Sequence, residues 1–227
     1  APLHEPVNRA YARPKAPDLA TILAADGSQI YPNTHGAALY YLTNVGVFVY
    51  HHGLDDLPEQ ITEPVLSYTE TLLYDERGQV ISNAAVNARR TVHEVQTLAR
   101  EVWNRRTIGR PMLAISDGPL LFWVGKDVPN GHRLQDDYLA AMVHLHDAHT
   151  ALYNDSGHSA SAIGYIDRPT SAFVVSLVYL MSLSPDDVRR AALETNGPLE
   201  GLTDQWLMFR LLRPGERSAL FVQQSPQ

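Results

Sequence analysis

Two short apolar runs that each end in Asp-Gly constrain this chain most. The first covers residues 19–28 (LATILAADGS) and the second covers residues 110–119 (RPMLAISDGP). An apolar run of this length, bounded by Gly and Pro, is typical of a strand that is buried on both faces of a mainly parallel sheet. The sequence therefore predicts two buried strands, each ending on an aspartate, Asp26 or Asp117.

The two aspartates are candidate metal ligands because ligand sites of open α/β sheets form at the carboxyl ends of the strands. If the strands are neighbours, Asp26 and Asp117 lie side by side, and two like charges at short range are costly unless a cation lies between them. The alternative is that each Asp-Gly pair is only a turn, since Gly accepts positive φ and Asp caps its own backbone. The repetition after two strand patterns favours the site.

The composition is that of a globular protein, with 44% hydrophobic and 19% charged residues in a chain of 227. The absence of cysteine excludes a disulfide framework and a thiolate metal site, and it fits a reducing, cytoplasmic compartment. No apolar run approaches the roughly 18 residues of a membrane span, and no signal peptide is expected. The net charge of −7 argues against a broad basic face for nucleic acid, but it is compatible with an acidic active site that divalent metals neutralise.

The first part of the chain is expected to be mainly β. Residues 1–18, rich in Pro and charge, predict an extended N-terminal arm, and residues 19–227 are expected to form one domain. The alternation over residues 36–53 predicts two antiparallel strands with a turn or bulge at residues 44–46, and a loop is expected over residues 54–64.

The second part alternates helices with strands. Apolar residues at three- and four-residue spacing predict a helix over residues 81–106. A strand is expected over residues 119–125, as a hairpin partner of the strand that ends at Asp117. The remaining expected elements are a helix over 134–153, a strand over 159–167, helices starting at Pro169 and over 184–194, a short amphipathic segment over 202–212 and a last strand after the turn at 214–215.

The predicted order, a strand, two or three antiparallel strands, then helix, strand, helix, strand and helix, is that of the ribonuclease H-like fold, an α/β fold with a mixed sheet flanked by helices. In that fold an Asp on the first strand, a Glu on the first helix and an Asp on the fourth strand hold two divalent metals for phosphodiester hydrolysis. Asp26 and Asp117 fall on the strand positions. Glu94 and Glu101 are the candidate helical carboxylates, two turns apart on one side of the helix. Hard oxygen ligands favour Mg²⁺ or Mn²⁺.

The chain also resembles the NurA nucleases over residues 19–223. The resemblance rests on the two Asp-Gly motifs, the segment GYIDRPTSAFVV at 164–175, LTDQW at 202–206 and PGERSALF at 214–221. It implies a Mn²⁺-dependent DNA nuclease, with Mg²⁺ as the other candidate ion, that has 5′-to-3′ exonuclease and single-strand endonuclease activity. It further implies a homodimer that resects broken DNA ends in repair together with a HerA-type hexameric ATPase, and no membrane partner.

Carried over to this chain, the resemblance makes Asp26, Glu94 and Asp117 the catalytic, metal-binding residues. An arginine-rich stretch precedes the family's Glu, and RRTVHEV at 89–95 favours Glu94, with Glu101 kept as the alternative. Asp167, followed by Arg168, stands where many members have a basic residue. Members usually continue past the PGERSALF strand into a strand and a helix that carries a His, so this C-terminal segment is expected to be lacking.

Further candidates each have a plainer alternative. Asp204 is a possible fourth carboxylate or a helix N-cap. Arg168, expected just before a helix, is a candidate phosphate ligand or the partner in a surface ion pair. The stretch HLHDAH at 144–149 resembles a zinc motif, but its place inside a predicted helix favours helix packing. Trp123 and Trp206 could stack on bases or belong to the core or an interface.

A second function class stays open from the sequence alone. The acidic composition and the expected loss of the C-terminal segment are also compatible with a non-catalytic ribonuclease H-like scaffold, or a DNA-end clamp, on an ATPase ring. Metal-dependent cleavage would separate the two classes.

Overall fold

The computed structural model describes residues 4–75, 77–126, 128–191 and 197–222. The chain divides into two compact units. One unit is Pro17–Ile166, and the other combines Ala1–Ala16 with Asp167–Gln227. The candidate catalytic residues on strands and on the long helix all belong to the Pro17–Ile166 unit.

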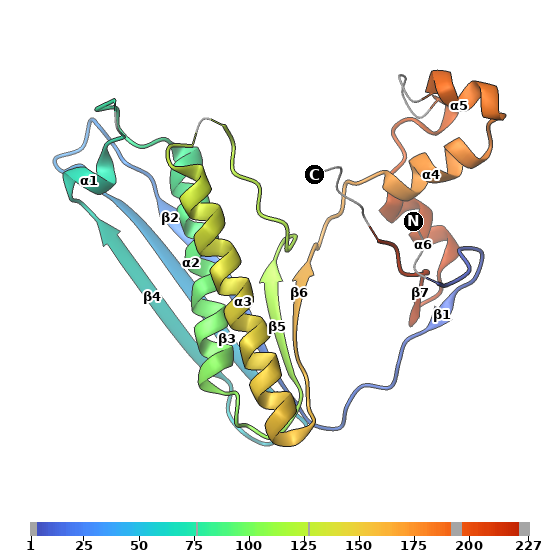
Figure 1. Ribbon diagram of the computed structural model, residues 1–227, viewed down its shortest axis with the longest axis horizontal. Coiled ribbons are helices and arrows are strands. Elements are labelled where there is room, and N and C mark those ends of the chain that lie inside the picture. The colour runs from blue at the N-terminus through green and yellow to red at the C-terminus, as the bar shows by residue number, and fades with distance from the viewer. Residues whose placement is uncertain (1–3, 76, 127, 192–196, 223–227) are drawn as a thin grey trace. The chain divides into compact units, whose positions relative to one another are not determined.

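A mixed five-stranded sheet forms the centre of this unit (Figure 1). Its spatial order is β4-β3-β2-β5-β6. Strands β2, β3 and β4 pair antiparallel, whereas β5 and β6 run parallel to β2. This arrangement confirms the predicted ribonuclease H-like α/β class. The strands are β2 Ala20–Ile30, β3 Tyr41–His52, β4 Glu59–Ser67, β5 Met112–Asp117 and β6 Ala160–Tyr165.

Two long helices, α2 (Asn83–Asn104) and α3 (Gly131–Ser156), lie side by side over one face of the sheet (Figure 1). The Ser82 hydroxyl caps α2 by accepting a hydrogen bond from the Ala85 amide at 3.2 Å. The predicted apolar stripe of α2 packs on the sheet, as expected. The core between helices and sheet includes Leu23, Val45, Val47, Val49, Val92, Val95, Leu98, Val102, Met112, Leu145 and Leu152.

Strand β2 does not end at Asp26, and this corrects the sequence-based prediction. Its residues pair with β3 without a break as far as Ile30, so Asp26 lies inside the strand, opposite Gly46. The second Asp-Gly does end a strand, because β5 stops at Asp117 and Gly118 takes a φ of 106° that favours glycine. Asp26 therefore lies where the neighbouring strand β5 ends, while β2 itself continues.

The expected hairpin over residues 36–53 is also wrong. Residues Tyr41–His52 form one continuous strand, and the turn occurs at Gly53, which has a φ of 77°. Gly46 is retained inside the strand because β3 is central and its backbone is hydrogen-bonded to β2 on one side and β4 on the other. The ladder compensates for the weak strand preference of a single glycine.

Two further local predictions fail for related reasons. The stretch expected to be a loop, 54–64, contains most of β4, which tolerates Pro64 and two glutamates because it is an edge strand. The expected strand over 119–125 is irregular, since the free edge of β5 is already occupied by β6. The short helix α1 (Glu70–Leu73) follows β4.

The second unit is built from short elements. Strand β1 (Tyr11–Ala12), within the predicted extended arm, pairs antiparallel with β7 (Glu216–Arg217). The helix expected to start at Pro169 starts at Phe173 instead, and residues 192–194 of the next expected helix lie outside the described residues. No helix in the described part of the chain is long and apolar enough to span a membrane. The remaining elements are α4 Phe173–Met181, α5 Pro185–Ala191, the 3-10 turn Gly197–Leu199 and α6 Asp204–Leu211.

Candidate active site

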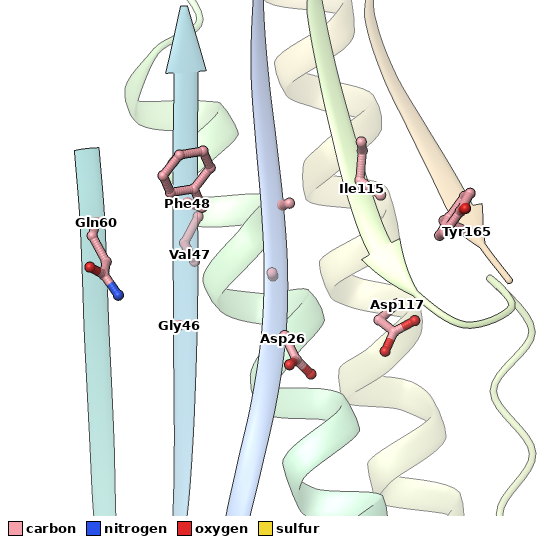
Figure 2. A pocket seen from close by; sticks show the side chains of 10 residues that line it. Asp26, Gly46, Val47, Phe48, Gln60, Ile115, Asp117 and Tyr165 are labelled. Atoms are coloured by element: carbon pink, nitrogen blue, oxygen red, sulfur yellow. The ribbon is translucent and has the colours of Figure 1, made fainter. Parts of the chain in front are cut away.

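Asp26 and Asp117 are neighbours across the β2–β5 pair. The parallel register aligns Ala25 with Ser116, and each aspartate is the next residue on its strand. Figure 2 shows the two carboxylates at the same level of the sheet, one on β2 and one at the end of β5. Both residues are exposed, and neither carboxylate has a hydrogen-bond or ion-pair partner within the described ranges. The predicted side-by-side placement is therefore present.

Glu94 approaches the same place from helix α2. The residue is only 6% exposed, and its Oε1 lies 3.1 Å from Arg90 Nε. Burial raises the pKa of Glu94; Arg90 opposes this shift, and the negative charges of Asp26 and Asp117 add to it. Glu94 thus lies within the electrostatic field of both strand aspartates, as a residue of a shared acidic site would.

Gly27 allows Glu94 to come this close. A Cβ atom at Gly27 would lie 2.2 Å from Glu94 Oε1 and 2.9 Å from its Cδ. A hydrogen bond from the Gly27 backbone favours the ionised form of Glu94 and so lowers its pKa. The glycine of the first Asp-Gly is therefore explained by the close approach of a helix carboxylate and not by a turn.

Arg90 holds Glu94 and is itself held by β2. Its Nη1 donates to the Gly27 carbonyl at 3.3 Å and to Gln29 Oε1 at 3.1 Å. The Gln29 side chain in turn donates to the Tyr31 hydroxyl at 2.9 Å. Sequence reasoning missed this role of Arg90, although its position four residues before Glu94 is the spacing of an ion pair within one helix.

Glu101, the alternative helical carboxylate, belongs to a different set of contacts. Arg105 Nη1 donates to its Oε2 at 2.7 Å, and Arg100 Nε lies 3.5 Å from its Oε1. Arg105 also donates to Glu59 on β4 at 2.6 Å. Seven residues along a helix correspond to a rise of about 10 Å. Among the two alternatives, the geometry therefore brings Glu94 to the strand aspartates and gives Glu101 to a helix–strand ion-pair network.

The donor set suits a hard divalent cation. Asp26 and Asp117 offer carboxylate oxygens on adjacent strands, which are the ligands that Mg²⁺ and Mn²⁺ prefer. In the described residues, however, no three Asp, Glu or His side chains lie close enough to form a ready metal site. The oxygen ligands of the two strand aspartates suit such a metal. The third carboxylate, Glu94, lies beside them in an ion pair with Arg90.

Two cavities meet at Asp117. A trough of about 400 Å³ on the face of the sheet that carries Phe48 is lined by Asp26, Gly46, Phe48, Asp117 and Tyr165 (Figure 2). A second cavity, of about 540 Å³, lies on the helix side, where Arg90, Glu94 and Asp117 form one part of its wall and Leu121 and Trp123 another. Neither cavity was predicted, because each combines residues from several elements.

Asp204 and Arg168 lie in the other unit. The Asp204 carboxylate accepts hydrogen bonds from the amides of Val174 at 2.8 Å and Val175 at 2.9 Å, and from the Ser171 hydroxyl at 2.9 Å. It thereby caps α4 from the start of α6. Arg168 is exposed to solvent beside Asp167. The sequence places it directly before a helix, but α4 begins five residues later, at Phe173. Their proposed roles as a fourth carboxylate and a phosphate ligand stay predictions.

The histidines of residues 144–149 are used in packing on α3. The His144 ring lies 5.1 Å from the Trp103 ring, and the His146 and His149 rings stack at 6.2 Å. His149 Nδ1 lies 3.2 Å from the Ala160 amide and 3.1 Å from its carbonyl oxygen. These contacts agree with helix packing, the plainer of the two interpretations.

Comparisons with solved structures give low similarity. The NurA nuclease from Sulfolobus solfataricus aligns with 69% of this chain at a TM-score of 0.36 and 9% identity. LC9-RNase H1, a type 1 RNase H with the type 2 active-site motif, aligns with 70% of this chain and 68% of its own at a TM-score of 0.30 and 12% identity. A foamy viral protease-reverse transcriptase in complex with an RNA/DNA hybrid aligns with 75% of this chain and 20% of its own chain, at a TM-score of 0.32 and 14% identity.

The chain spans half the length of the Sulfolobus nuclease, and no curated protein matches it significantly. The family comparison is more decisive. The model of the NurA domain matches residues 20–225, which include both Asp-Gly motifs, Glu94 and most of the second unit. The chain therefore belongs to the NurA domain family.

Proposed function

We propose that this protein is a metal-dependent DNA nuclease. Its active site for phosphodiester hydrolysis is formed by Asp26, Glu94 and Asp117. The single observation that carries the proposal is the convergence of these carboxylates. Asp26 and Asp117 follow the aligned pair Ala25 and Ser116, and the charges of both raise the pKa of Glu94. Membership of the NurA domain family supports the same chemistry.

Asp26 and Asp117 would hold divalent metal ions, which supply charge neutralisation and an activated water when bound, and Glu94, held beside them by Arg90, is the candidate third ligand. The protein's own contribution is positional. Adjacent strands fix Asp26 and Asp117, and Arg90 holds Glu94 against Gly27. Arg90 also supplies a positive charge within an acidic cluster, which reduces the repulsion among the carboxylates.

The finer features of the proposal come from the family resemblance. We propose Mn²⁺ as the preferred ion, with Mg²⁺ as the other candidate, and 5′-to-3′ exonuclease and single-strand endonuclease as the activities. The partners are DNA, a second copy of the chain and a HerA-type hexameric ATPase, with DNA end resection in the cytoplasm as the process. Each of these needs its own measurement.

The first test is cleavage of labelled single- and double-stranded DNA with Mn²⁺, Mg²⁺ or EDTA. We expect cleavage with metal and none with EDTA. Asp117→Asn should reduce the rate by about three orders of magnitude, since a metal ligand contributes several kcal/mol to the transition state. Asp147→Asn is the matched control, because Asp147 is an exposed aspartate on α3 of the same unit, and it should cleave like the wild type.

The result also decides between the two function classes. A folded wild type that cleaves no DNA with any of these ions would contradict the nuclease proposal. It would favour the non-catalytic scaffold or DNA-end clamp. Cleavage that survives Asp117→Asn would show that the activity, if intrinsic, lies elsewhere in the chain.

A further inference from the structure

The cavity on the helix side is lined by two chemically different groups. One is the charged group Arg90, Glu94 and Asp117, and the other consists of apolar side chains of residues 119–125, among them Leu121 and Trp123. Its volume of about 540 Å³ lies within the range of sites that bind small organic groups. A ligand that fills this cavity would contact both the carboxylates and an indole.

The segment that carries Trp123 is firmly attached to the sheet and to α3. The Gly118 amide donates to the Tyr165 carbonyl on β6 at 2.8 Å, and the Tyr138 hydroxyl donates to the Leu120 carbonyl at 2.9 Å. The Phe122 ring stacks on Tyr138 at 4.9 Å. These contacts fix the segment on both sides of Leu121.

Gly164 contributes to this attachment from β6. A Cβ atom there would lie 2.4 Å from the Gly118 carbonyl oxygen and 3.0 Å from the Leu120 amide. Only glycine at position 164 leaves room for the backbone of residues 118–120 at this distance. The position of these residues therefore depends on a glycine in β6.

The attachment leaves two apolar side chains in solvent. Phe122 turns inward, whereas Leu121 is 56% exposed and Trp123 is 60% exposed. An exposed indole forgoes the stabilisation that burial of so large an apolar side chain normally gives. Its position on a fixed segment that shares a cavity with Asp117 and Glu94 indicates a ligand-binding role.

We propose that this cavity is a base-binding subsite in which Trp123 stacks on an unpaired base next to the phosphodiester that is cut. This inference rests on the proposed nuclease function and adds to it the residue that holds a base of the substrate. An indole stacks on any base, so the subsite is tolerant of sequence. A base inside a duplex is already stacked and paired, so the subsite selects a single strand or a frayed end. Trp123 is a positioning residue that acts by holding the nucleotide.

Binding of labelled oligothymidylate tests the proposal independently of cleavage. The measurement uses fluorescence anisotropy with Ca²⁺ in place of Mn²⁺, under conditions in which a gel shows intact DNA. Trp123→Ala should weaken binding about 5- to 150-fold, the range expected for loss of one base–aromatic stack. Trp123→Phe keeps an aromatic ring and should restore most of the affinity.

A matched control comes from the far end of α3. Tyr153 is 59% exposed and lies 22 residues after Gly131, about 33 Å along the helix. Tyr153→Ala should bind oligothymidylate like the wild type. Thermal unfolding of all variants shows whether a change in affinity follows a loss of fold.

A second readout locates the stacked base. One abasic site is moved along the oligonucleotide, and the wild type should lose affinity at one position more than at the others. Trp123→Ala should lose this position dependence, because the stack is already absent. Three results would overturn the subsite: the wild type does not bind the oligonucleotide, it binds with the same affinity as Trp123→Ala, or it shows no position at which an abasic site weakens binding more than elsewhere.

The failure of the subsite and the failure of the nuclease proposal are separable. Metal-dependent cleavage that is lost in Asp117→Asn, together with unchanged binding in Trp123→Ala, would retain the nuclease and reject the subsite. Binding that depends on Trp123, in a protein that cleaves no DNA, would retain the subsite as part of a DNA-end clamp and reject the nuclease.

Discussion

At the scale of single residues, the candidate site depends on a glycine as much as on its carboxylates. The side chain of Glu94 occupies the space that a Cβ atom of residue 27 would need. The conflict involves the far end of a flexible side chain, so the fold can accommodate a larger residue by moving Glu94. What would be lost is the placement of Glu94 relative to Asp26 and Asp117.

Replacement of Gly27 is therefore predicted to separate activity from stability. Gly27→Ala should reduce DNA cleavage on the order of 100-fold, because a displacement of about 1 Å at a reacting group has that effect. Its melting temperature should change little. Gly46→Ala is the control for stability, since the added methyl group would meet only the Asp26 carbonyl, at 3.8 Å. A Gly27→Ala enzyme of normal rate would show that the position of Glu94 is unimportant.

At the scale of elements, α2 carries two buried glutamates with different tasks. Glu94 is 6% exposed and Glu101 is 7% exposed, so burial does not distinguish them. Their surroundings do. Glu94 lies against Gly27 of β2, and Glu101 is bonded to Arg105, which also reaches Glu59 on the edge strand β4.

Neutral substitutions at the two positions should therefore have opposite consequences. Glu94→Gln should abolish most of the cleavage, because a carboxylate of the metal site is lost. Glu101→Gln should keep the cleavage rate but reduce the free energy of unfolding by about 1.5–3 kcal/mol, the range for a hydrogen bond to a charged group. Urea unfolding and a cleavage assay on both variants are the measurements. Loss of cleavage in Glu101→Gln, without loss of fold, would reverse the assignment.

The lengths of neighbouring strands matter at the same scale. Strand β2 continues to Ile30, four residues beyond Asp26, whereas β5 ends at Asp117. The site therefore forms where one strand leaves the sheet beside another that continues. The sequence marks the departure at Gly118 with a glycine, but nothing in the first Asp-Gly indicates that its strand goes on.

At the scale of the whole molecule, the second unit joins the two ends of the chain. Arg217 donates to Glu5 through Nη1 and Nη2, each at 2.8 Å, and the Leu220 amide donates to Glu5 Oε2 at 2.9 Å. The hydrogen bond from Arg217 is the main cause that lowers the pKa of Glu5 from 4.5 to about 2. Because the folded pKa is depressed, this stabilisation is complete above pH 4.5 and is lost as the pH falls toward 2.

Glu5→Gln should loosen the attachment of the N-terminal arm at neutral pH. The measurement is hydrogen exchange of the Leu220 amide, which should be faster in the variant than in the wild type. The difference should shrink to about half near pH 2, the pKa of the folded carboxyl, and vanish below it, where the wild-type carboxyl is also protonated. Glu200→Gln, at an exposed glutamate of the same unit, should exchange like the wild type. An unchanged Leu220 amide in Glu5→Gln would contradict the attachment.

The sequence by itself determined the class of fold, since the period of the apolar residues decides which segments become helices or buried strands. It also determined that both aspartates lie on strands, because each follows a buried apolar run. It could not determine where β2 and β3 end. Asp-Gly and Gly46 are compatible with both a turn and a strand, and only hydrogen bonds to neighbouring strands decide between them.

Only the tertiary structure decided which glutamate of α2 meets the aspartates. Both glutamates lie on the same side of the helix, and helix periodicity treats them alike. Which of the two glutamates lies beside the aspartates depends on the position of α2 along the sheet, and the packing of the core sets this position. The same holds for the cavity at Trp123, whose walls come from α2, β5 and the segment after it. Contacts between segments distant in sequence leave no local pattern, and they emerge only when the chain has packed.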